Sequence, residues 1–112
     1  MAELAIEHDE LAVRLSLLEK LGALHGDLRV PRSAVRRVRV TSTPWNEVRG
    51  MRAPGTGVPG VIMLGTMRGM FGKDFCAVYR HQSAIVIELE DHPYQRLILC
   101  TPNPDEDRVA LG

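Results

Sequence analysis

The stretch FCAVYRHQSAIVIEL, residues 75–89, contains two apolar runs, Phe75–Tyr79 and Ala84–Leu89, on either side of a polar, turn-like separator. Each run has the length of a β-strand and is too short for an ordinary helix. Further runs of this kind lie on both sides, Val61–Met67 and Arg96–Cys100. Strand-like runs that recur about every ten to twelve residues between turn signals are typical of an antiparallel sandwich or barrel.

The N-terminal part of the chain predicts a β-hairpin and then a short helix. Leu4–Glu7 and Leu11–Leu15 flank a polar turn of three or four residues. Ser16 and Glu19 have the spacing of a capping box, which marks the start of a helix. A helix of about two turns is marginal alone, so we expect packing to hold it. Its apolar side is one helical face made of leucines, namely Leu17, Leu18, Leu21 and Leu24.

The remaining segments complete a mainly-β chain. Leu28–Pro31 reads as a short extended piece, and Val35–Thr41 alternates valine and arginine as a strand with one basic face. Asn103 followed by Pro104 predicts a short C-terminal helix. We therefore expect one domain over residues 1–112: an antiparallel barrel or sandwich of about seven strands with a short early helix and a short terminal one.

Residues 41–60 are rich in glycine and proline and show no hydrophobic period, so we expect a long loop there. Tryptophan and arginine are residue types that anchor interfaces. The candidate binding residues of this segment, for an interface or a ligand, are Trp45, Arg49, Arg52 and Thr56. Trp45 has an alternative interpretation, in which it folds back to close an open end of the barrel.

The layout resembles that of the small bacterial pleckstrin-homology-like (PH-like) domains. The similarity rests on the order of short strands, on the extended segment Leu28–Val35 before a strand, and on Leu97–Cys100 running through Thr101-Pro102 into a helix that begins at Asn103. It implies a scaffold that serves many binding functions. Two features depart from it: the terminal helix is short, and the Leu17–Leu24 helix lies between early strands, where a turn is common.

Several partner classes are excluded by charge and composition. The chain has 112 residues, with 14 basic and 14 acidic side chains, so no basic excess points to nucleic acid. No apolar stretch approaches the ~20 residues of a membrane helix. The turn Glu7–Glu10 is acidic where phosphoinositide-binding PH domains carry basic residues, so we expect no phosphoinositide binding. Only Cys76 and Cys100 occur, both in apolar runs, and we expect buried thiols in a cytoplasmic protein.

No motif supports catalysis or a cofactor. Gly55–Gly60 matches G-x-G-x-x-G, but it does not follow a strand or open a helix, as dinucleotide binding requires. The four histidines are scattered, without the spacing of a metal site. The cluster Arg36, Arg37 and Arg39 could clamp an anion, although a solvated strand face paired with acids such as Glu88 and Glu90 is the favoured interpretation. We therefore predict no catalytic residues, no metal and no cofactor.

The sequence thus predicts a non-catalytic binding or assembly module whose partner is protein. The alternative is a small-ligand or anion-binding domain that uses the loop at residues 44–60. Self-association as a homodimer is expected, because the terminal helix offers only Val109 and Leu111 to cover an end of the barrel.

Overall fold

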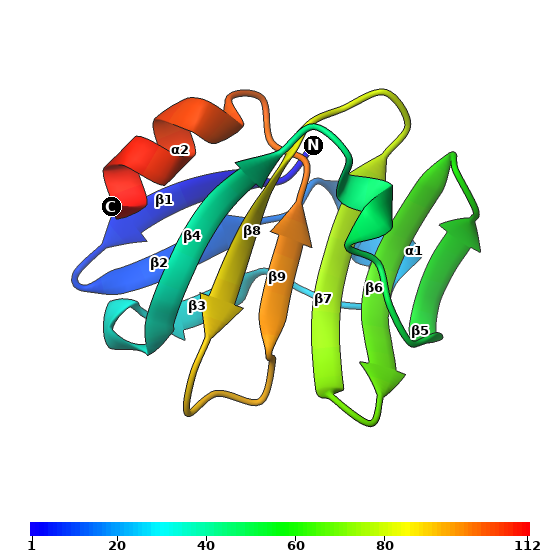
Figure 1. Ribbon diagram of the computed structural model, residues 1–112, viewed down its shortest axis with the longest axis horizontal. Helices are drawn as coiled ribbons and strands as arrows, with labels where there is room; N and C mark the ends of the chain where they lie inside the picture. The colour runs from blue at the N-terminus through cyan, green and yellow to red at the C-terminus, as the bar shows by residue number, and fades with distance from the viewer.

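The computed structural model describes residues 1–51 and 55–112 in full, and residues 52–54 only as part of the backbone of a strand. The described residues form nine strands in two sheets, with a short early α-helix and a C-terminal α-helix (Figure 1). This confirms the mainly-β fold with its two short helices, although the strands number nine rather than about seven.

The smaller sheet contains β1 (Glu3–Glu7), β2 (Glu10–Arg14) and β3 (Leu28–Pro31), in that order. The predicted β1–β2 hairpin is present, but its turn has two residues rather than three or four, since Glu7 pairs with Glu10. His8 and Asp9 both have positive φ, 49° and 63°. Positive φ at both central residues matches the twist of the flanking strands and makes a tight two-residue turn favourable. Helix α1 (Leu17–Ala23) is inserted between β2 and β3.

The larger sheet has the strand order β4-β8-β9-β7-β6-β5. Its strands are β4 (Val35–Thr41), β5 (Met51–Val58), β6 (Ile62–Gly69), β7 (Gly72–Tyr79), β8 (Ala84–Leu89) and β9 (Arg96–Leu99). All neighbours in it are antiparallel except β7 and β9. Strand β9 turns back from β8 and occupies the place between β8 and β7, so it must run in the direction of β7. The pair β7–β9 therefore departs from the antiparallel arrangement that the sequence predicts.

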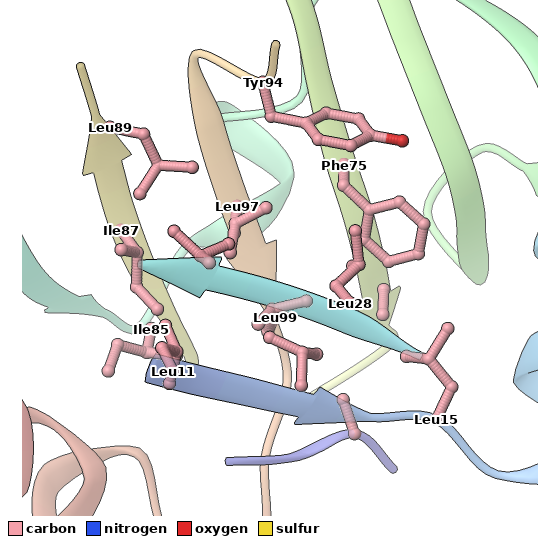
Figure 2. Close-up of a cluster of buried hydrophobic side chains, with 14 of the residues drawn as sticks. Leu11, Leu15, Leu28, Phe75, Ile85, Ile87, Leu89, Tyr94, Leu97 and Leu99 are labelled. Atoms are coloured by element: carbon pink, nitrogen blue, oxygen red, sulfur yellow. The ribbon is translucent and has the colours of Figure 1, made fainter. Parts of the chain in front are cut away.

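The main core lies between the two sheets. Leu11, Val13 and Val30 of the smaller sheet pack with Phe75, Ile85, Ile87, Leu97 and Leu99 of the larger one. Figure 2 shows several of these side chains, with Tyr94 beside Phe75 at one end of the cluster. Burying a side chain of this size contributes about 1.5–3 kcal/mol to folding. The apolar pattern of the strands therefore fixes how the two sheets stack.

The opposite face of the larger sheet is also buried. Met63, Cys76, Val86, Ile98 and Cys100 form a second cluster there, against which Trp45 and Val48 pack. These two residues come from the segment that crosses the front of the sheet in Figure 1, shown in green. Continuous apolar runs such as Ile85–Ile87 arise because both of their faces are covered. Both free cysteines are buried, as the apolar flanks predicted.

Helix α2 (Pro104–Leu111) packs against β1, β4 and β8 (Figure 1). The predicted N-cap is present: the Asn103 side chain accepts a hydrogen bond from the Glu106 backbone N–H at 3.3 Å. Leu111 is buried, whereas Val109 is 71% exposed. One apolar side chain rather than two thus anchors this helix.

The prediction of a loop throughout residues 41–60 is wrong for its second half. Residues Pro44–Asn46 form a 3-10 turn, and Met51–Val58 form β5 at the edge of the larger sheet. Glycine and proline weaken strands in general, but an edge strand tolerates them because one side of it has no ladder partner. The register of β5 on β6 shifts between Arg52 and Gly55, and this irregularity hides the period-2 pattern.

Gly55 is expected to be essential to β5, because its φ is +150° and an added Cβ would overlap the carbonyl oxygen of Leu64. Gly55→Ala should lower the free energy of unfolding by at least about 2 kcal/mol, measured by urea denaturation. Gly26→Ala is the matched control, since a Cβ at Gly26 meets nothing within 4 Å. Equal stability of the two variants would contradict the close approach of β5 to β6.

Candidate functional site

Helix α1 begins with the capping box that the sequence predicts. The Ser16 hydroxyl accepts a hydrogen bond from the Glu19 N–H at 3.2 Å, and Glu19 Oε1 accepts one from the Ser16 N–H at 2.8 Å. Two N–H groups that would otherwise lack partners at the start of the helix are thereby satisfied. The capping box also directs the Glu19 side chain back toward the first turn.

Glu19 lies on the buried side of α1 and is only 1% exposed. Its second oxygen, Oε2, accepts a hydrogen bond from the hydroxyl of Tyr79 in β7 at 2.6 Å. Burial, together with this carboxylate, raises the pKa of Tyr79 well above its usual range, so the phenol stays protonated and donates. A buried carboxylate is costly unless it is hydrogen-bonded, and both oxygens of Glu19 are bonded here.

Gly22 brings α1 close to the larger sheet. Its carbonyl oxygen accepts a hydrogen bond from the Thr56 hydroxyl of β5 at 2.7 Å. A Cβ at this position would lie 2.8 Å from Leu64 Cδ1 of β6. Together with Ala23, which is also buried, Glu19 and Gly22 occupy positions i, i+3 and i+4 of one helical face. This is the face that α1 turns toward the sheet.

The leucines of α1 consequently point to solvent. Their exposed fractions are 73% for Leu17, 79% for Leu18, 64% for Leu21 and 70% for Leu24. We call these four residues the leucine face. The prediction that they are the side by which the helix packs is wrong, because the buried side carries Glu19, Gly22 and Ala23 instead. An exposed apolar cluster of this kind marks an interaction surface more often than chance.

The two charged side chains of α1 itself, Glu19 and Lys20, are both engaged. The one cationic residue of the helix, Lys20, lies 3.6 Å from Asp27, measured from Nζ to Oδ1. Val58 and Val61 at the β5–β6 turn are 52% and 44% exposed. Val58 lies on the same side of β5 as Thr56, the residue that bonds to α1. The exposed apolar surface therefore extends from the helix toward this turn.

The structure places the sequence-predicted residues apart from the leucine face or beneath it. Thr56 is under α1. Trp45 packs against the outer cluster of the larger sheet, with its ring N–H buried and unpartnered. Arg49 bonds to the fully buried Asp74, from Nε to Oδ2 at 2.8 Å, and its guanidinium lies 3.9 Å from the Phe71 ring centre. The side chain of Arg52 lies outside the described residues.

Arg49 belongs to a network of ion pairs on the outer face of the larger sheet. Asp74 also accepts hydrogen bonds from Arg96, at 3.1 Å from Nη2. Arg96 bridges to Glu47 at 3.1 Å, and Glu47 in turn pairs with Arg39. These bonds hold residues 44–50 against the sheet. Arg39, read from the sequence as part of a basic strand face, is therefore engaged by Glu47 rather than directed at an anion.

Three other features could indicate a function of the described residues: a metal site, a membrane-spanning helix and a surface pocket. Within residues 1–51 and 55–112, no three His, Cys, Asp or Glu side chains gather where they could hold a metal ion. No helix in the described part of the chain is long and apolar enough to cross a membrane. A surface pocket beside α2 is lined by Asp105, Glu106, Val109 and Ala110, and none of these belongs to residues 44–60.

Sequence reasoning found the leucines but assigned them to the wrong environment. The signal that could have corrected it is the face Glu19, Gly22, Ala23, in which two small residues follow the capping glutamate. Small residues allow a helix to approach a sheet closely, whereas leucines hold it away. Comparison with protein-family models, curated proteins and solved structures gives no match to this chain.

Glu47 gives the ion-pair network a pH dependence. Hydrogen bonding by Arg39 lowers the pKa of Glu47, against the effect of burial. Because the folded-state pKa is below the unfolded one, the stabilisation is present above the unfolded value and is lost as pH falls through the folded value. Glu47→Gln should reduce stability at pH 7 by about 1–2 kcal/mol.

The difference between wild type and Glu47→Gln should shrink as the pH of urea denaturation is lowered from 7 to 3. Glu3→Gln, at an exposed position of β1, is the control and should track wild type throughout. A constant gap at all pH values would show that the Glu47 charge contributes nothing.

Proposed function

We propose that this protein is a non-catalytic protein-binding module and that the leucine face of α1 is its binding surface. The observation that carries the proposal is the orientation of the helix, in which Glu19 is buried and all four leucines are exposed. A helix whose orientation were set by burial of its apolar side alone would show the opposite arrangement. The inward carboxylate accepts hydrogen bonds from the Ser16 N–H and the Tyr79 hydroxyl, so the orientation is built in.

The spacing of the leucines fits recognition of protein by a helix. Leu17 and Leu21 are at i and i+4 of α1, which are anchor positions of a helix that lies against an apolar surface of its partner. Leu24 extends this apolar surface from the left-handed C-cap of the helix. Each of these leucines, and Leu18 beside them, leaves between 64% and 79% of its surface in water. A partner that covers this area gains from its burial, and a second copy of the chain is included among such partners. We propose that the protein forms homodimers.

We propose that the protein acts in the cytoplasm and without catalysis. The two cysteines are unpaired and buried, which suits a reducing compartment. The buried carboxylates Glu19 and Asp74 are engaged by Tyr79 and by two arginines, so they serve the fold. We also propose that the domain is PH-like. Two packed sheets and a terminal helix support this resemblance, whereas the parallel pair β7–β9 departs from it.

The alternative, a small-ligand or anion-binding domain using residues 44–60, has weaker support. Pro44 is buried and Trp45 and Val48 pack flat on the sheet. Arg49 is engaged by Asp74, and Met51–Val58 form β5. The described part of this segment is thus used in building the domain.

The proposal predicts contact with protein at the leucine face. A photo-cross-linking amino acid at Leu17, introduced in cells of the organism that encodes the chain, should give a protein adduct of discrete mass. Leu21→Glu in the same chain should abolish this adduct, because a carboxylate cannot enter an apolar contact without a large desolvation cost. The matched control is the same probe at Val109, an exposed apolar residue of the other helix, which should give none. Adducts of equal yield at both positions, or none at Leu17, would contradict the proposal.

A further inference from the structure

We infer that the occupant of the leucine face is a second copy of this chain, bound across a two-fold axis so that one α1 packs on the other. This inference rests on the proposed function and names the partner. Figure 1 shows α1 behind β6 at the margin of the larger sheet, away from α2. Its outward side is therefore presented to solvent, and the exposed fractions of all four leucines agree.

Charge favours a contact of this face with itself. In a two-fold interface, the same patch is contributed by both chains, so residues near the axis meet their own kind. A charged patch would place like charges opposite one another. The leucine face avoids this problem, because Glu19 is turned inward and Lys20 is beside Asp27. The chain as a whole carries no net charge, so long-range repulsion does not oppose pairing.

The other exposed apolar cluster does not share this property. Met51 and Met70 are 79% and 108% exposed, at the β6–β7 end of the larger sheet. Met51 pairs with Arg68 across the β5–β6 ladder, and Arg68 pairs with Lys73 across the next. Basic residues are thus interleaved with those methionines, whereas the one basic residue of α1, Lys20, is beside Asp27. The leucine face is therefore the better self-complementary surface.

The shape of the leucine face also suits a helix–helix contact. Leu17 and Leu21 form a ridge along the helix with Leu18 beside it, and Leu24 follows at the left-handed C-cap. A second copy offers the same ridge and groove. The helix has seven residues and is about 10 Å long, so the contact spans two turns at most. Exposed Val58 and Val61 could be covered at the margin of such a contact.

The contact available to such a dimer is small. The leucine face and the two valines are six residues, whereas a standard stable interface has about 20–30 residues on each side. The dimer should therefore dissociate in the micromolar range and depend on concentration, rather than being obligate.

Analytical ultracentrifugation of the full chain tests this inference. From about 1 µM to about 300 µM, the apparent mass should rise from 12.4 kDa toward twice that value. Leu21→Glu and Leu21→Lys should each remain monomeric, with unchanged circular dichroism and melting temperature, because the side chain is exposed in the monomer. Val109→Glu is the matched control and should dimerise as wild type does.

An equimolar mixture of the Leu21→Glu and Leu21→Lys chains distinguishes a contact between two leucine faces from any other mode of association. Near a two-fold axis, the Leu21→Glu chain and the Leu21→Lys chain become complementary, so the equimolar mixture should regain at least part of the association that each lacks alone. Monomeric wild type at the highest concentration, or variants that still dimerise, would overturn the inference. A discrete adduct at Leu17 with a different protein, together with monomeric wild type, would leave protein binding by the leucine face standing and remove the homodimer.

Discussion

The hydrogen bond from Tyr79 to Glu19 determines which side of α1 faces the protein. Once the carboxylate is buried and bonded at 2.6 Å, the helix cannot rotate its leucines inward without breaking this bond and leaving the Tyr79 hydroxyl without its acceptor. The capping box at Ser16 and the close approach at Gly22 hold the same orientation. The exposed leucine face, and with it the proposed binding of protein, follows from this one constraint.

The rest of the domain is consistent with that interpretation because both faces of its larger sheet are covered. The inner face of the larger sheet is buried by the smaller sheet, and the outer face by Trp45 and Val48. The ion pairs of Asp74, Arg96 and Glu47 fasten that covering segment. The folding of the sheets therefore does not depend on the leucines, which remain available for a partner.

Much of the fold could be predicted from local sequence, and the site only in part. The strands of residues 75–99 have apolar runs of strand length, and the caps Ser16 and Asn103 act over three residues, so local reasoning found them. Strand β5 was missed because its glycines are compatible with a strand only at the edge of a sheet. Which strand lies at the edge depends on the strand order, which local sequence does not reveal. The predicted orientation of the leucines was wrong, because the orientation is decided by the hydrogen bond between Glu19 and Tyr79. These two residues lie sixty positions apart in the chain.

The most direct test of the account is thiol accessibility on the two sides of α1. Leu21→Cys and Ala23→Cys differ by two residues, and the two native thiols are buried, with burial raising the pKa of Cys76 to about 12. In native protein, below the concentration of dimer formation, a maleimide should label position 21 rapidly and position 23 slowly. In denaturant both should react at similar rates. Rapid labelling at position 23 with protection at position 21 would show that the leucines face the core and would contradict the account.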